Sequence, residues 1–255
     1  KDLHDDNKID ISTASITLTG TIDYNKANTV NGYTNKTVTV GTLTDTMSKI
    51  TDVYGLKPAL GAVDGVSIAS AAITATSAVS KANADTLNTY TLGQVTLQSV
   101  EDVYAELIKI DALNSAQVAM AAAAVKVTDS VDKTKVDALL ADTTGTVTVE
   151  RITESASNLK LIGKSDYGAG HANIEYDTLS LAGAALTVTG TTNKADALVL
   201  KGYVTDGGAS GTVTLQGASG SLTDLQALHD DSSIDISTAS ISITGTVSKG
   251  NLTTA

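Results

Sequence analysis

One 20-residue segment occurs twice in this chain, and that duplication constrains the fold more than any other feature. Residues 3–22 (LHDDNKIDISTASITLTGTI) recur as residues 228–247 (LHDDSSIDISTASISITGTV), with 15 of the 20 positions identical. Weaker copies of the same strand-like ending lie between them, at successive offsets of 57, 52, 61 and 55 residues. These copies begin at Ile16, Ile73, Val125, Leu186 and Ile241. The chain is therefore predicted to hold about four and a half repeats of roughly 55 residues.

Each repeat is predicted to contain three short strands. An apolar residue precedes each of the five copies by seven positions: Ile9, Val66, Val118, Leu179 and Ile234. A third apolar segment follows in four repeats, around Val38, Val95, Val147 and Val213. Apolar residues alternate with Thr or Ser in the second and third segments, which is the pattern of a half-buried strand.

The two longer connections of each repeat have helical patterns. SKANADTLN from Ser80 and DKTKVDALL from Asp132 lie between the second and third strands. After the third strand, apolar residues recur at helical spacing in two repeats. These stripes are Val100, Val103, Tyr104, Leu107 and Ile108 in one repeat and Leu43, Met47, Ile50 and Tyr54 in the other. The pairs Thr42 with Asp45, Ser99 with Asp102, and Ser221 with Asp224 resemble helix caps.

Strands and helices that recur in one order predict a parallel β-solenoid with helical connectors, in which equivalent strands stack on one another. We expect right-handed coils with three parallel strands and two helical connectors each. Residues 1–255 would form a single array. Its coils would cover approximately residues 9–65, 66–117, 118–178 and 179–233, with a partial coil at 234–255.

The composition favours a thin core and argues against several kinds of partner. The chain has no Cys, Trp or Phe, so small and β-branched side chains must fill the core. Its net charge is −11 and Arg151 is its one arginine, which argues against nucleic acid as a partner. The absence of Cys excludes disulfides and thiolate metal sites. No apolar run reaches the ~18 residues that a membrane span needs, so the chain is predicted not to span a membrane.

Catalytic patterns are missing from the sequence, and we predict that the protein is not an enzyme. The three histidines are His4, His171 and His229, and His4 and His229 occupy the same repeat position. None is paired at zinc-ligand spacing, and no G-x-S-x-G motif is present. Gly163-Lys164-Ser165 resembles the end of a phosphate loop, but Asn158 stands where that loop needs its first glycine.

Two equivalent acidic clusters are the candidate metal site. Their residues are Asp5, Asp6 and Asp10 in the first copy and Asp230, Asp231 and Asp235 in the last. Calcium takes several carboxylate and carbonyl oxygens, so each cluster could supply part of a calcium shell. Asp also caps backbone N–H groups in turns. Calcium is thus the one cofactor considered, beside a purely structural interpretation.

Paired threonines recur in T-x-T spacing and resemble the ladders of ice-binding surfaces. The second and third strands both carry them, as at Thr17 with Thr19 and Thr146 with Thr148. A helix separates these two strand families in the chain, so we expect them not to share one plane. Ordinary β-propensity explains Thr in half-exposed strands. Asn35 and Asn251 begin tripeptides that fit the N-glycosylation sequon.

The order of strand, helix, TGTVT strand and helix resembles the repeats of giant exported proteins from marine cyanobacteria and related bacteria. The residues that carry the resemblance are 81–88 (KANADTLN), 144–148 (TGTVT) and 152–159 (ITESASNL). It implies a Cys-free, acidic protein with a cell-surface or extracellular location. Many such proteins also carry glycine-rich, calcium-binding nonapeptides. This chain has no run of them, so the resemblance does not imply calcium dependence here.

The sequence therefore favours a structural role in an extracellular filament, surface layer or stalk. Neither end resembles a polar cap, so we expect the chain to stack head to tail on itself or on flanking repeats of a longer chain. The alternative is a binding module, an adhesin or phage-fibre segment with variable loops between its coils. Residues 163–178 (GKSDYGAGHANIEYDT) would then be the contact loop.

Overall fold

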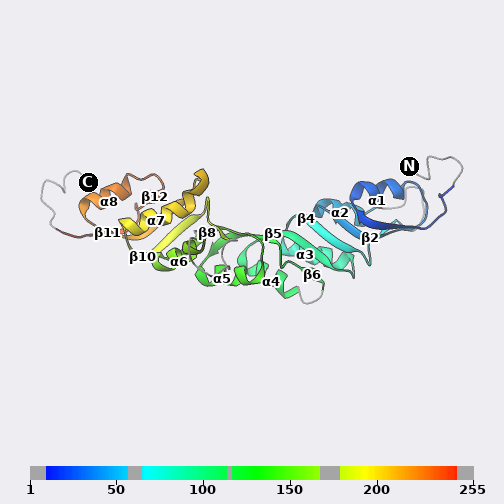
Figure 1. Cartoon of the computed structure of the whole chain (residues 1–255), viewed down its shortest axis with the longest axis horizontal. Helices are drawn as coiled ribbons and strands as arrows, with labels where there is room; N and C mark the ends of the chain where they lie inside the picture. The colour runs from blue at the N-terminus through cyan, green and yellow to red at the C-terminus, as the bar shows by residue number, and fades with distance from the viewer. Residues whose placement is uncertain (1–9, 57–64, 114–116, 167–178, 246–255) are drawn as a thin grey trace. The chain divides into compact units, whose positions relative to one another are not determined.

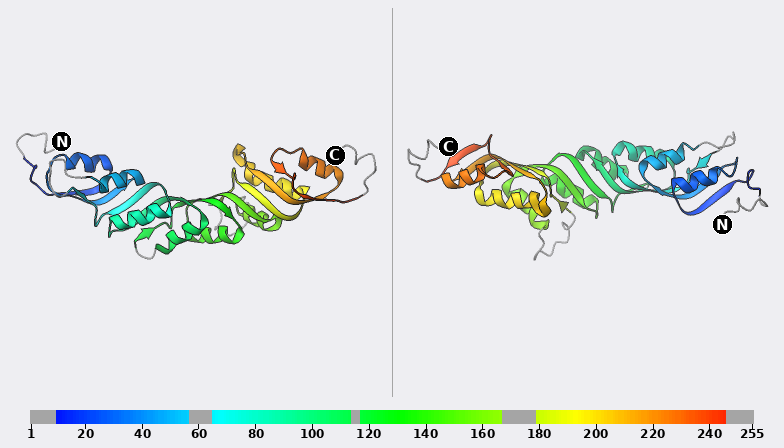
Figure 2. Two further views of the ribbon diagram at one scale, coloured as in Figure 1. Left: turned by 180° about the vertical axis from the view of Figure 1, so that it is seen from behind. Right: turned by 90° about the horizontal axis from the view of Figure 1, so that it is seen from above.

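The computed structural model describes residues 10–56, 65–113, 117–166 and 179–245 (Figure 1). The chain divides into two compact units, Lys1–Ala124 and Val125–Ala255. The described residues contain thirteen strands and eight α-helices, and every pairing given between strands is parallel. In both units each strand of seven or more residues is followed by a helix (Figure 2).

In the first unit the strands lie in the order β1-β2-β4-β5, which is their order in the chain. The short strands β3 and β6 lie beside β2 and β5. The elements are β1 (Ile16–Ile22), α1 (Tyr24–Asn31), β2 (Val38–Asp45), α2 (Met47–Tyr54), β3 (Val66–Ser67), β4 (Ala72–Val79), α3 (Lys81–Tyr90), β5 (Val95–Asp102), α4 (Tyr104–Leu113) and β6 (Val118–Ala119).

The second unit repeats this arrangement with the order β7-β8-β10-β11. Strand β9 lies beside β8, and β12 and β13 both lie beside β11. The elements are β7 (Ala124–Val131), α5 (Lys133–Asp142), β8 (Val147–Ser155), α6 (Ala156–Asp166), β9 (Leu179–Ser180), β10 (Ala185–Asn193), α7 (Lys194–Thr205), a 3-10 turn (Asp206–Gly208), β11 (Thr212–Gly220), α8 (Leu222–His229), β12 (Ile234–Asp235) and β13 (Ser240–Ile243).

The predicted β-solenoid is wrong, because the chain forms an open parallel α/β sheet. A solenoid would place Ile73 beside the equivalent residues Ile16 and Val125. The structure instead places Ile73 between Leu43 of β2 and Val95 of β5. The second and third strands of a repeat are thus direct neighbours in one sheet. A strand, a short helix and a second parallel strand form a compact crossover, and such consecutive elements usually lie side by side.

In each unit one face of the sheet carries the core, and helices cover that face. In β5, for example, Val95 and Leu97 are buried whereas Thr96 and Gln98 are more exposed. The buried strand residues pack with buried helix residues such as Ile50 and Leu87. The other face of the strands holds half-exposed and exposed polar side chains. This alternation shows that the helices leave one sheet face open.

The third strands extend further than their sequence indicates. Val100 and Leu43 were expected to begin helical stripes, but they are fully buried in β5 and β2. Helices α4 and α2 begin only at Tyr104 and Met47. A register shift between Ala75 and Ala78 breaks the strand alternation. Across this shift the buried residues Leu97 and Val100 of β5 are three positions apart, so strict alternation is lost where the strand continues toward α4.

The predicted helix caps are correct in one case of three. Ser221 caps α8, since its Oγ accepts a hydrogen bond from the backbone N–H of Asp224 at 3.2 Å. Thr42 and Ser99 instead lie within β2 and β5. Thr46 caps α2 and accepts from the backbone N–H of Lys49. Within the described residues, no helix is long and apolar enough to cross a membrane.

Candidate functional site

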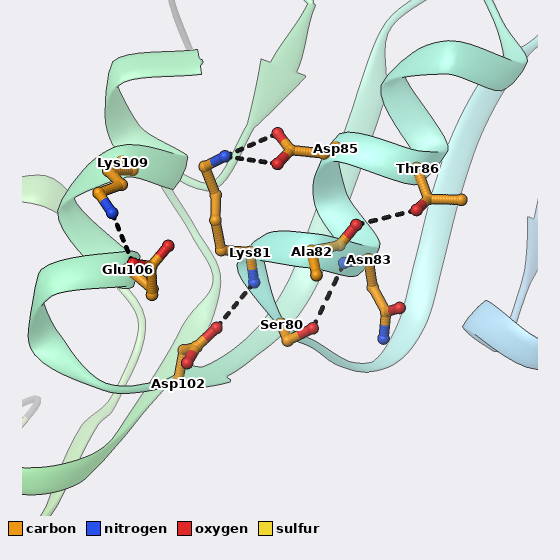
Figure 3. Close-up of polar contacts among 9 residues, drawn as sticks. All are labelled: Ser80, Lys81, Ala82, Asn83, Asp85, Thr86, Asp102, Glu106 and Lys109. Carbon is orange, nitrogen blue, oxygen red and sulfur yellow. Dashed lines mark hydrogen bonds and ion pairs between the residues drawn. The ribbon is translucent and has the colours of Figure 1, made fainter.

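The ends of the third strands carry a recurring carboxylate that joins neighbouring elements. Asp102, the last residue of β5, accepts hydrogen bonds from two backbone N–H groups at 2.9 Å, and Figure 3 shows the one from Lys81. One belongs to Val103, its neighbour in the chain, and the other to Lys81, the first residue of α3. Ser80 caps the same helix from within, because its Oγ accepts from the backbone N–H of Asn83. The N-terminus of α3 is therefore capped twice, by Ser80 just before the helix and by Asp102 of the strand that follows it.

The same contact occurs at two more strand ends. Asp45 of β2 accepts from the backbone N–H of Thr46 at 2.8 Å and from that of Tyr24, the first residue of α1, at 3.0 Å. Glu154 of β8 accepts from the backbone N–H of Ser155 at 2.7 Å. This bond is the main cause that lowers the pKa of Glu154, and the backbone N–H of Lys133 at the start of α5 also contributes.

Sequence reasoning assigned Asp45 and Asp102 to the wrong helices. They were expected to begin the helices that follow them, but their carboxylates reach the helices that precede the strand. The signal available in the repeats was an acidic residue near the end of three of the four third strands, two positions before the next helix; β11 has none. The contact itself depends on strands β1 with β2 and β4 with β5 being neighbours.

Ion pairs surround these caps on the helix surfaces. Lys81 pairs with Asp85 at 2.6 Å, and Lys109 pairs with Glu106 at 2.5 Å (Figure 3). The first pair lies within α3 at a spacing of four residues, and the second lies within α4 at a spacing of three. Exposed pairs of this kind contribute little to stability. In this region, the hydrogen bonds from strand-end carboxylates to helix backbone N–H groups are therefore the contacts that hold each helix against the next strand.

The residues predicted to bind calcium lie partly outside the described structure. This applies to Asp5 and Asp6, whereas Asp10 is described. Asp10 Oδ1 accepts from the backbone N–H of Ser12, and Asp235 Oδ1 accepts from that of Ser237, each at 2.9 Å. The two equivalent residues thus make the same turn contact.

Asp230 and Asp231 have separate partners. Lys201 Nζ of α7 lies 2.7 and 3.0 Å from the Asp231 oxygens, and the backbone N–H of Ser233 donates to Asp231 at 3.0 Å. The lysine is the main cause that lowers the pKa of Asp231. Asp230 is exposed and lies 3.3 Å from His229 Nδ1. In the part of the chain that the structure describes, no group of His, Cys, Asp or Glu is arranged to hold a metal ion.

Threonines of the second and third strands share the open sheet face, contrary to the expectation that they would be separated. Thr17 lies opposite Thr39, and Thr74 lies opposite both Thr44 and Thr96. In the second unit Thr187 lies opposite Thr214. The ladder is interrupted in that unit by an ion pair between Lys126 and Glu150 at 2.9 Å. The twist of parallel strands also works against a flat, ice-like array.

The remaining sequence motifs form no common site among the described residues. Gly163, Lys164 and Ser165 belong to the last turns of α6, and their side chains are outside the described part. Asn35 lies between α1 and β2, where its backbone N–H donates to the carbonyl of Ser12. His4, His171, Asn251 and most of the 163–178 segment also lie outside the described residues.

An apolar groove lies between α8 and β13 in the second unit. It has a volume of about 630 Å³, and its lining includes Leu222, Leu225, His229, Ile241 and Ile243. Ile241 and Ile243 belong to β13, the last described strand. Sequence reasoning did not identify this groove.

The fold and these contacts define an α/β repeat array with helices on one sheet face. Comparison with protein-family models, curated proteins and solved structures finds no match to this chain. The functional argument therefore rests on the contacts of the chain itself.

Proposed function

We propose that the chain is a structural repeat protein of an extracellular filament, surface layer or stalk. The observation that carries the proposal is the strand order, which follows the chain order within each unit. In such an array a further strand and helix can be added beside the outermost strand without rearranging the others. The cross-strand carboxylates support this role, because each one joins a helix to the strand that follows it.

Self-assembly head to tail is the mode of growth that this architecture favours. Among the described residues β1 pairs only with β2, and β13 pairs only with β11. Unpaired parallel edges recruit other strands. A contact between unlike ends does not close on itself and therefore produces a filament. The net charge of −11 would limit non-specific association between chains.

Electron microscopy and light scattering of the purified chain test the proposal. We expect regular unbranched fibres whose length increases with protein concentration. Monodisperse monomers at high concentration would contradict self-assembly. Antibody labelling of intact cells tests the proposed extracellular or surface location. The proposal assigns no catalytic role, so turnover in a broad hydrolase screen would also count against it.

The open sheet face favours a binding module as the second candidate function. Its exposed and half-exposed polar side chains have no helix above them, as an adhesin or phage-fibre segment would need. The variable segments between repeats, including residues 163–178, would supply further contacts. Deleting residues 167–178 should abolish attachment to cells or glycans under this alternative. The same deletion should leave fibre formation intact under the structural proposal.

A further inference from the structure

The last described strand exposes apolar residues that every inner repeat buries. Ile241 and Ile243 of β13 are 49% and 39% exposed. The equivalent residues Ile73 and Ala75 of β4 are at most 1% exposed, and so are Leu186 and Val188 of β10. Strands β4 and β10 each have a third strand on both sides and are followed by helices α3 and α7, whereas β13 has a third strand on a single side and is the last described element.

The first and last strands lack opposite neighbours. An inner residue such as Ile73 lies between Leu43 of the preceding strand and Val95 of the following strand. Its equivalent Ile241 has only the preceding neighbour, Ala218 of β11. Its other equivalent, Ile16, has only the following neighbour, Val38 of β2. These statements cover the described residues. The last strand thus has the preceding neighbour of an inner second strand, and the first strand has the following neighbour.

The two end segments are also nearly the same in sequence. Residues 10–22 and 235–247 differ at three of 13 positions, and all three changes are conservative. They place Thr17 where Ser242 stands, Leu18 where Ile243 stands, and Ile22 where Val247 stands. The segment that contains β1 can therefore present the same side chains to β11 in the same register as β13 does.

We propose that β1 of a second copy replaces β13 beside β11, so that one strand is paired on both edges at each junction between copies. This inference rests on the proposed structural role and specifies its contact. Ile16 of the incoming copy would lie between Ala218 of the first copy and its own Val38. The exchange favours β1 because β13 has four residues, all exposed, whereas β1 has seven and leads directly into α1.

The incoming copy would also cover the apolar groove at α8. In the first unit the rings of Tyr54 and Tyr90, at the ends of α2 and α3, stack with centroids 3.9 Å apart. His229 ends α8 as Tyr54 ends α2. Tyr33 is the counterpart of Tyr90, because the next residues, Thr34 and Thr91, each donate to an equivalent alanine carbonyl at 2.6 Å. Tyr33 of the second copy would therefore stack on His229.

Cysteine pairs in the full chain test this contact, and the absence of native Cys makes the result unambiguous. Ser219 lies opposite Ser242, whose counterpart is Thr17. Opposite residues of neighbouring strands are close enough for a disulfide. The double variant T17C with S219C should therefore form disulfide-linked dimers and higher multiples on a non-reducing gel. The single variants T17C and S219C are the matched controls, and neither should produce that ladder.

A second variant holds β13 in place, so that β1 of another copy cannot replace it beside β11. S219C with S242C should form an internal disulfide that holds β13 against β11. The oxidised form should remain monomeric by light scattering, and reduction should restore assembly. Fibres formed by the oxidised, locked chain, or the absence of a ladder from T17C with S219C, would overturn the exchange but leave the structural proposal intact. Failure of the unmodified chain to assemble would instead contradict both.

Discussion

At the scale of single residues, the carboxylates at strand ends satisfy backbone groups that secondary structure leaves unpaired. The first N–H groups of a helix have no partner within that helix. Asp102 accepts from the first residue of α3, and its negative charge lies at the positive end of that helix. Because Asp102 belongs to a different strand, one side chain both caps the helix and joins two elements.

Replacing Asp102 should therefore destabilise the protein more than breaking a nearby ion pair. We expect D102A to lower the free energy of unfolding by about 1–2 kcal/mol, since two backbone N–H groups lose their acceptor. D102N keeps one acceptor oxygen and should have a smaller effect. Urea unfolding followed by circular dichroism measures the change. The control D85A removes only an exposed pair with Lys81 and should cost less than about 0.5 kcal/mol; equal losses in D102A and D85A would contradict the capping role.

Asp231 should make stability depend on pH in the acid range. Lys201 lowers its pKa in the folded state, whereas an unfolded Asp titrates near about 3.9. Its contribution is therefore complete above that value and is lost as the pH falls further, through the folded pKa. D231N should lower the melting temperature at pH 7, and its difference from the unmodified chain should narrow below about pH 4. The exposed neighbour Asp230 supplies the control D230N, and a difference that stays constant down to pH 2 would exclude this explanation.

At the scale of elements, the turns between helices and third strands bring two backbone segments very close together. A Cβ at Gly93, between α3 and β5, would lie 2.3 Å from the carbonyl oxygen of Ala71. Gly211, at the equivalent place before β11, would meet Ala184 O at 2.7 Å. The turn before β4 and the turn before β5 therefore pack backbone against backbone.

Two glycine substitutions should have opposite effects for this reason. G93A should destabilise the protein by roughly 1–3 kcal/mol, because backbone has to move to admit the methyl group. G202A in α7 should stabilise it by about 0.5–1 kcal/mol, since a Cβ there meets no atom within 4 Å and Ala favours a helix. Thermal unfolding of both variants gives the comparison. A G93A protein as stable as the unmodified chain would show that the turn relaxes easily.

At the scale of the whole molecule, the question raised by the acidic clusters is whether the stability of the array depends on a bound metal ion. Asp10, Asp231 and Asp235 each accept a hydrogen bond from a backbone N–H group in a turn. These contacts do not require a metal ion. The whole array should then fold to the same stability with or without calcium.

Chelation is expected to leave the melting temperature of the full chain unchanged. The measurement compares thermal unfolding with a calcium chelator, with added calcium and with magnesium as the control ion. A melting temperature that falls on chelation and recovers with calcium alone would establish the calcium interpretation for the clusters at residues 5–10 and 230–235. It would also add Asp5 and Asp6 to the functional residues of the chain.

Local patterns were enough to predict the short first strands and the helices between the second and third strands. Val66, Val118, Leu179 and Ile234 begin short strands, and the segments after Ser80 and Asp132 are helices, as their spacing indicated. Such patterns succeed because alternation and helical spacing depend on neighbours in the chain. The near-identity of the two end segments likewise comes from the sequence alone, and it supplies the contact proposed between copies.

Only the tertiary structure decided which strands are neighbours. The second and third strands carry the same alternation of apolar residues and threonine. Pairing equivalent strands of successive repeats, or pairing a second strand with a third strand, would therefore bury the same side chains. The structure places Ile73 between Leu43 and Val95, and this choice replaces a solenoid with an open sheet. It also brings Asp102 to α3 and places the threonines of both strand families on one face. These contacts join residues about 20 positions apart in the chain, beyond the reach of local pattern.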